Sequence, residues 1–125
     1  MVPTLPHGAE PRRLTGSMPR TLLQRHLVDV SDRLKRLRAE LAVTDEQCAF
    51  FESEAEDARL RSLVSETPVA EAEAREFRRH ADAQGRHRDS LRRAVGELEA
   101  EQNALLDRMA AEMAASPRSS EAEVR

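Results

Sequence analysis

Residues 58–74 read ARLRSLVSETPVAEAEA and place Thr67-Pro68 between two long heptad repeats. Threonine caps helix N-termini and proline is favoured at the first helical position, so a new helix is expected to start here. On both sides, apolar residues recur in steps of four and three, the pattern of coiled-coil helices. The upstream seam consists of Leu23, Leu27, Val30, Leu34, Leu37, Leu41, Thr44, Cys48, Phe51, Ala55 and Ala58. The downstream seam consists of Ala70, Ala74, Phe77, Ala81, Gln84, Arg88, Leu91, Val95, Leu98, Gln102, Leu105 and Met109.

Folding the chain back near Glu66 brings the two seams together in antiparallel order and pairs Leu41 with Leu91. This register also pairs charges across the interface, and each exposed pair contributes about 0.2–1 kcal/mol. The expected pairs are Arg33–Glu101, Arg61–Glu73, Glu52–Arg78, Arg59–Glu71 and Glu54–His80, with Arg38–Arg92 as a like-charge clash. We therefore predict an all-α fold in which two long helices form an antiparallel coiled-coil hairpin. The alternative is one uninterrupted helix kinked at Pro68, because a long dimer can tolerate the cost of about 3 kcal/mol of an internal proline.

The hairpin is predicted to occupy residues 20–115, with its turn near 65–68 and helices from about Arg20 to Val64 and from about Pro68 to Ala115. The proline- and glycine-rich residues 1–19 are expected to form a flexible basic tail. Met18 within this tail is a candidate translation start. Ser116-Pro117 is expected to end the second helix, because the residue before a proline is biased away from helical backbone angles. Residues 116–125 are then predicted to form a flexible polar tail.

The composition excludes several classes of protein. Charged residues make up 34% of the 125 residues and aromatic residues 2%, which is typical of extended helices rather than a compact globule. The net charge of −3 and the absence of aromatic residues for base stacking from the Arg-rich residues 78–93 do not favour nucleic acid as a partner. No apolar run approaches the roughly 20 residues of a membrane span, so no membrane partner is expected. The nearly lysine-free basic composition indicates a GC-rich bacterium, and we expect a cytoplasmic protein.

Two blocks of charge lie on opposite sides of the predicted turn. Residues 45–57 contain six acidic and no basic side chains, and residues 78–93 contain six arginines. The favoured interpretation is that the hairpin lays these blocks side by side, so that each neutralises the other. The alternative is an Arg-rich helix face that holds an acidic partner or a nucleotide.

A polar layer interrupts both seams and consists of Thr44, Cys48, Gln84 and Arg88. Polar residues at seam positions fix register and orientation at some cost in stability. The alternative role is a small socket for a ligand or a partner side chain. No cofactor-binding, metal-binding or catalytic residue is predicted, because the cysteine is single and the histidines lack ligand spacing. A two-helix coil is also expected to lack an active-site pocket, so we predict that the protein is not an enzyme.

Apolar side chains outside the seams are the candidate partner-binding residues. They are Leu22, Val43, Phe50 and Val64 on the first helix, with Leu106 and Met113 on the second. Three explanations remain open: hairpins that pair into a four-helix bundle, a surface that docks a partner helix, or scattered apolar residues without a role. We predict a non-enzymatic protein–protein interaction module, a scaffold or adaptor that associates with itself as a homodimer or four-helix bundle.

One family has a similar architecture. The predicted hairpin resembles actinobacterial anti-sigma factors that bind cyclic di-GMP through a Glu-x3-Ser-x2-Arg-x3-Gln-x3-Asp pattern. In the nearest stretch Ser90 and Arg93 match, whereas Arg86, Glu97 and Glu101 depart from the pattern. The resemblance implies a transcriptional or signalling regulator as the alternative function, and it carries over no nucleotide-binding residue.

Overall fold

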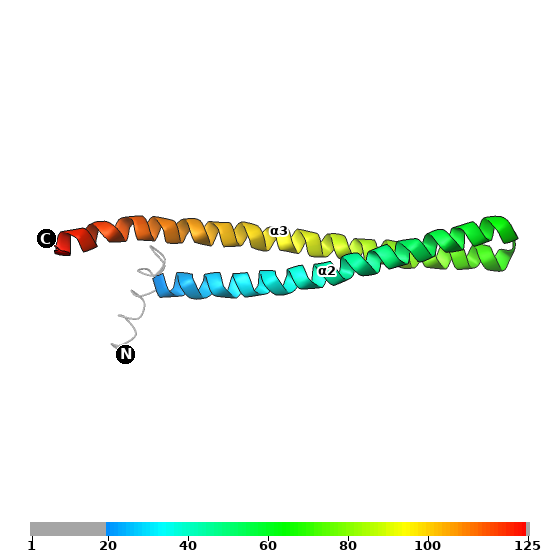
Figure 1. Ribbon diagram of the computed structural model, residues 1–125, viewed down its shortest axis with the longest axis horizontal. Helices are drawn as coiled ribbons and strands as arrows, with labels where there is room; N and C mark the ends of the chain where they lie inside the picture. The colour runs from blue at the N-terminus through cyan, green and yellow to red at the C-terminus, as the bar shows by residue number, and fades with distance from the viewer. Residues whose placement is uncertain (1–19, 125) are drawn as a thin grey trace, which may run out of the picture. The chain divides into compact units, whose positions relative to one another are not determined.

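The computed structural model describes the backbone of residues 20–124 and the side chains as far as Ala115. Its two helices are α2, Arg20–Ser65, and α3, Pro68–Val124 (Figure 1). They pack against each other as an all-α hairpin, which confirms the predicted fold and shows the uninterrupted helix to be wrong. The predicted basic tail and Met18 lie outside the described residues.

The two residues between the helices are placed by local backbone chemistry. Glu66 adopts left-handed backbone angles, with a φ of 51°, and its N–H donates to the Ser62 carbonyl at 3.0 Å. This bond closes the end of α2 in the left-handed type of C-cap. The Thr67 hydroxyl oxygen accepts a hydrogen bond from the Ala70 N–H at 3.1 Å and so caps the start of α3. The helix boundaries predicted at the turn are therefore confirmed to within one residue.

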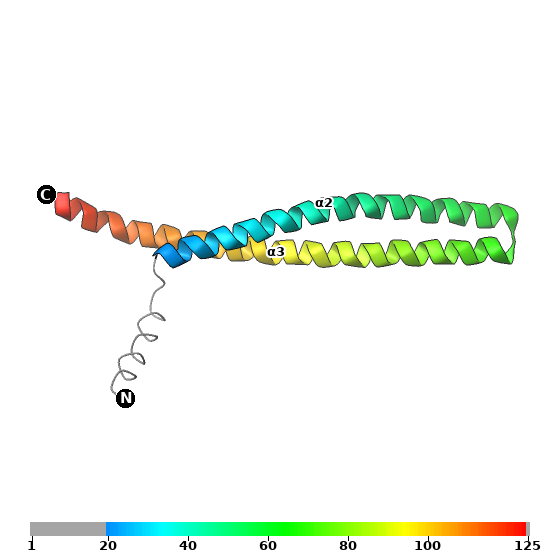
Figure 2. The same cartoon turned by 90° about the horizontal axis from the view of Figure 1, so that it is seen from below.

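Residues 33–98 form one compact unit, which contains the turn. In this unit α2 and α3 lie side by side in both views (Figures 1 and 2). All predicted seam residues of the unit are buried or half-buried. Away from the turn its core is built from large side chains, namely Leu34, Leu91, Val95 and Leu98.

Residues 20–32 and 99–124 belong to a second unit. Its core contains Leu23, Val30 and Leu105, all buried. Gln102 of the seam donates through Nε2 to the Ser31 hydroxyl at 3.0 Å. The predicted seam is thus confirmed in this unit as well.

The C-terminal end of α3 differs from the prediction. We expected the helix to stop at Ser116-Pro117, but α3 continues to Val124. A proline inside a helix costs about 3 kcal/mol, largely because it removes one backbone hydrogen bond, but its fixed φ is itself helical. The alanine-rich residues 110–115 before it favour helix strongly enough to carry the backbone through.

Candidate functional site

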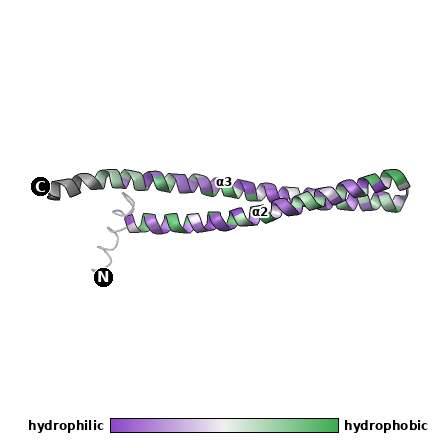
Figure 3. Ribbon diagram, viewed as in Figure 1, coloured by the Kyte–Doolittle hydropathy of each residue, from purple (hydrophilic) through white to green (hydrophobic). Residues whose placement is uncertain are grey.

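In the part of the hairpin next to the turn, the fully buried side chains are small and several large apolar side chains are exposed. The fully buried residues between 44 and 81 are all small: Thr44, Cys48, Ala55, Ala58 and Ala81. The two phenylalanines of the seams in this stretch, Phe51 and Phe77, are half-buried. Phe50 is 59% exposed in the same stretch, and Leu60, Leu63, Val64 and Val69 are exposed as well. Figure 3 shows hydrophobic ribbon where α2 ends and α3 begins. An apolar surface of this kind marks a site of interaction more often than an isolated exposed leucine does.

Four exposed apolar side chains of α2, Val43, Phe50, Leu60 and Val64, lie on a second heptad repeat on the face opposite the core, whereas the exposed Val28 and Leu63 lie off it. We call this repeat the outer seam of α2; it consists of Ala39, Val43, Glu46, Phe50, Ser53, Asp57, Leu60 and Val64, all exposed. Three of the predicted partner residues, Val43, Phe50 and Val64, lie on it. Leu60 was missed by the sequence analysis, although its heptad spacing from the others could have revealed it.

The other predicted partner residues lie elsewhere. Leu22, Leu106 and Met113 are exposed, but they belong to the unit of residues 20–32 and 99–124. Leu22 occupies the same heptad position of α2 as Val43 but lies outside residues 33–98, and Leu106 and Met113 lie on α3.

The predicted polar layer is present, and its members differ in how well they are satisfied. Thr44 and Cys48 are buried. The Arg88 side chain is half-buried, and its Nε lies 3.3 Å from the Asp89 carboxylate. Gln84 has a buried carbonyl oxygen, Oε1, with no hydrogen-bond donor among the described residues. The layer therefore includes one buried polar atom without a hydrogen bond. Such an atom lowers the stability of the fold, as is expected of a polar residue that fixes the register.

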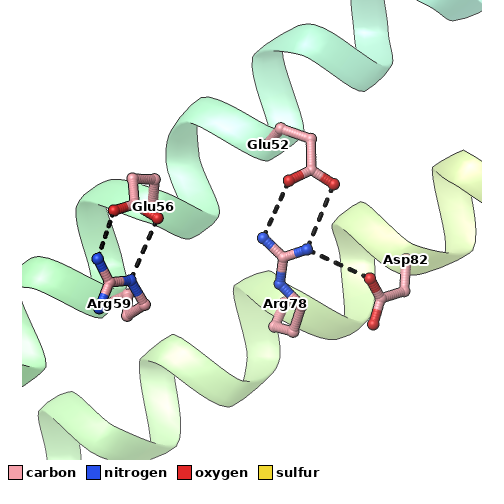
Figure 4. A network of polar contacts seen from close by, with 5 residues as sticks. All are labelled: Glu52, Glu56, Arg59, Arg78 and Asp82. Carbon is pink, nitrogen blue, oxygen red and sulfur yellow. Dashed lines mark hydrogen bonds and ion pairs between the residues drawn. The ribbon is translucent and has the colours of Figure 1, made fainter.

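Arg78 links the two helices beside the outer seam (Figure 4). Its guanidinium contacts both carboxylate oxygens of Glu52, at 3.0 and 3.3 Å, and Asp82 at 3.3 Å. The hydrogen bond to Glu52 raises the pKa of Arg78. The predicted Glu52–Arg78 pair is therefore confirmed. Arg92 similarly reaches Asp45 on α2 at 3.5 Å, so the acidic and basic blocks do meet across the hairpin.

Other predicted ion pairs are replaced by different partners. Arg59 contacts Glu56 on its own helix at 2.7 Å instead of Glu71, and this hydrogen bond lowers the pKa of Glu56. Glu101 contacts His26 at 3.0 Å instead of the predicted arginine. His80 lies 3.6 Å from Glu76 on its own helix. Partners three or four residues away are always within reach on a helix, so they compete with partners across the interface.

A groove of about 410 Å³ lies between the helices near the turn. Small seam residues open it, and its lining consists of Ala55, Ala74, Arg59, Arg75, Arg78 and Arg79. We expected no pocket in a two-helix coil, so this groove is a correction, explained by the alanines that leave its floor unfilled. Arg59, Arg78 and Arg79 are already paired with carboxylates. An anionic ligand would have to compete with these carboxylates, and the lining offers no nucleophile or acid–base pair.

No group of three or more His, Cys, Asp or Glu side chains that could hold a metal ion occurs in the described part of the chain. Neither described helix is long and apolar enough to cross a membrane. No protein-family model matches the chain, and no curated protein or solved structure is significantly similar to it. The features that bear on the function of the protein are therefore those of the hairpin surface.

Proposed function

We propose that the protein is a non-enzymatic coiled-coil interaction module, a scaffold or adaptor of a bacterial cytoplasm, that docks helices on the outer seam of α2. The observation that carries the proposal is the exposure of large apolar side chains near the turn. Phe50 is 59% exposed, whereas Ala55 and Ala58 in the neighbouring core are 3% and 1% exposed. Burying a large apolar side chain contributes about 1.5–3 kcal/mol, so a partner that covers Phe50 and its neighbours gains most of what this surface can offer.

Self-association belongs to the proposal because the hairpin alone has a weak core near its turn. Helical stability in proteins comes chiefly from packing an apolar face, and backbone ordering costs about 1–2 kcal/mol per residue. The fully buried alanine, threonine and cysteine side chains contribute little apolar surface, and Phe51 and Phe77 of the seams are only half-buried. Pairing of hairpins into a four-helix bundle supplies the missing apolar contact.

The test compares Phe50→Asp with Val28→Asp in the full-length chain. Both residues are exposed to a similar degree, but Val28 lies outside the outer seam and in the other unit. We expect both variants to keep wild-type helicity by circular dichroism, and only Phe50→Asp to lose association in analytical ultracentrifugation and partner capture from the native host. A Phe50→Asp variant that sediments and captures partners as the wild type does would refute the proposal.

A second candidate function, regulation through the Arg-rich face of residues 78–93, has one supporting observation. Arg86 and Arg93 make no ion pair with any residue from 20 to 115, whereas Arg78 and Arg92 are engaged by α2. Binding of an acidic domain or a nucleotide by this face would weaken steeply with salt. Docking dominated by the apolar outer seam would keep most of its affinity under the same conditions.

A further inference from the structure

We infer that the outer seam of α2 binds the outer seam of a second copy of this chain, in an antiparallel, two-fold symmetric pair of hairpins. The inference rests on the proposed function and names the partner of the same surface. Because the outer seam lies opposite the core, α2 of one chain can meet α2 of the other with both α3 helices on the outside. A two-fold contact of this kind uses one surface twice, so no second face of the hairpin has to be covered.

The outer seam is complementary to itself when it is read in the reverse direction. We place Ala39 of one chain opposite Val64 of the other, so that the two seams overlap over their full length. Every residue of the seam then faces a member of the same seam, and the pairs, each formed twice, are Ala39–Val64, Val43–Leu60, Glu46–Asp57 and Phe50–Ser53. A shift by one heptad in either direction shortens the overlap and sets the Glu46 carboxylate against Val64 or Phe50.

The residues beside the outer seam support the same register. Ala42 and Leu63 flank the seam on one side, and Glu40 and Arg61 flank it on the other. In the proposed register Leu63, which is 61% exposed in the hairpin, faces Ala42 of the second chain. Arg61 faces Glu40 of the second chain, and it makes no ion pair with another described residue. The contact thus covers every exposed large apolar side chain of α2 within residues 33–65, namely Val43, Phe50, Leu60, Leu63 and Val64.

One layer of the proposed contact sets like charges against each other. Glu46 faces Asp57 in this layer, and neither carboxylate makes an ion pair with another described residue. Facing carboxylates weaken the association, but they also give the register a property that can be measured. Replacing either acid with lysine turns the layer into an ion pair, and replacing both restores like charges. A parallel pair, in which Glu46 faces Glu46, predicts no such alternation.

The experiment measures the dissociation constant of the full-length chain by sedimentation equilibrium at one pH and one salt concentration. We expect Glu46→Lys and Asp57→Lys each to tighten self-association about fivefold or more, because repulsive contacts become ion pairs. The variant that carries both lysines is expected to return to within about twofold of the wild type. Asp32→Lys is the control, because it changes the net charge equally at an exposed residue of α2 in the other unit, and it should leave the dissociation constant unchanged.

A second pair of substitutions tests the flank of the seam. Arg61→Glu and Glu40→Arg should each weaken self-association about fivefold, because each sets like charges against each other. The variant that carries both restores opposite charges between the chains and should recover association. Since Glu40 also lies 3.9 Å from His87 of its own chain, Arg61→Glu is the more direct of the two single changes.

The inference is overturned by a monomeric wild type, by single lysine variants that do not tighten association, by an equal gain from Asp32→Lys, or by a double lysine variant as tight as the single ones. A combined Glu40→Arg and Arg61→Glu variant that fails to recover overturns it too. If the wild type is monomeric but Phe50→Asp still abolishes capture of a host partner, the inference fails and the proposed function stands. Should a lysine lower helicity, Glu46→Gln and Asp57→Asn remove the same repulsion and should tighten the pair by a smaller factor.

Discussion

Replacing Gln84 with leucine should stabilise the hairpin. The Oε1 atom of Gln84 is buried and has no donor among the described residues. An unpaired buried polar atom costs about 1–3 kcal/mol, and leucine removes that atom and keeps a side chain of similar length. Since Gln84 is only half-buried, we expect the free energy of unfolding to rise by about 1–2 kcal/mol, towards the lower end of that range.

Gln102 provides a matched control, because it is also a half-buried glutamine of the α3 seam. Its Nε2 donates to the Ser31 hydroxyl at 3.0 Å, so Gln102→Leu removes a hydrogen bond worth about 0.5–1.5 kcal/mol. Thermal unfolding followed by circular dichroism at one fixed protein concentration compares the two variants, since association also affects the melting temperature. A change of 1 kcal/mol shifts the melting temperature by about 4–8 °C in a domain of this size.

Two outcomes would refute the reasoning about Gln84. The first is a Gln84→Leu variant that melts below the wild type. The second is an equal gain from Gln102→Leu, which would show that any added leucine in the seam stabilises and that the unpaired oxygen costs nothing. Sedimentation of Gln84→Leu also tests the polar layer, because loss of a register-fixing residue should produce a mixture of oligomers.

The turn, the helix interior and the ion pairs yield further predictions. Glu66→Gly should raise the urea midpoint of unfolding. Glycine relieves the strain of the left-handed backbone at residue 66, about 1–2 kcal/mol, and this gain exceeds the free-energy cost of the greater unfolded-state entropy of glycine, about 0.5–1 kcal/mol. A lower midpoint would contradict the left-handed cap. Thr67→Ala should cost about 1 kcal/mol in the same assay through loss of the N-cap, and an unchanged midpoint would show that the cap is dispensable. Gly96→Ala should add about 1 kcal/mol, because a Cβ there meets nothing within 4 Å; destabilisation would mean that another chain approaches this glycine. Hydrogen bonds from arginines lower the pKa of Glu56 and Glu76 below the ordinary 4.5. The stability that these two ion pairs contribute is therefore present above about pH 4.5 and is lost as the pH falls through the lowered pKa values. The melting temperature should drop on acidification, and the drop should be smaller in high salt.

The hairpin itself could be predicted from the sequence because its determinants are local and periodic. Heptad spacing follows from helix geometry, so Leu23 and Leu34 could be assigned to the core without knowledge of their contacts. The Thr67-Pro68 dipeptide fixes the start of α3 through the chemistry of two neighbouring residues. The left-handed backbone of Glu66 was harder to predict from the sequence, since glycine is the usual residue at that position of a helix cap.

The polar contacts could be predicted only in part. Arg78 reaches Glu52 as expected, but Arg59 turns to Glu56 on its own helix. The choice between such partners depends on side-chain rotamers and on differences of a few tenths of a kcal/mol, which sequence spacing does not resolve. The uncompensated oxygen of Gln84 is likewise a property of packing. Leu60 was missed for a different reason: it has a different heptad position from Val43, Phe50 and Val64, and the other residues at its position, Ala39, Glu46 and Ser53, are small or charged.

The exposure of large apolar side chains near the turn is hard to explain by the needs of the hairpin alone. Phe50 and Leu60 lie in the same stretch of α2 as the buried Ala55 and Ala58, so large apolar residues were available for the core. Exchanging the two classes between faces would leave composition and helix propensity almost unchanged and would bury more apolar surface within one chain. A hairpin that acted alone would gain stability from that exchange. The observed arrangement instead leaves Phe51 and Phe77 as the large side chains of the seams in this stretch, both half-buried. It places Phe50, Leu60 and Val64 on the outer seam, where they gain apolar contacts only when a second helix covers them.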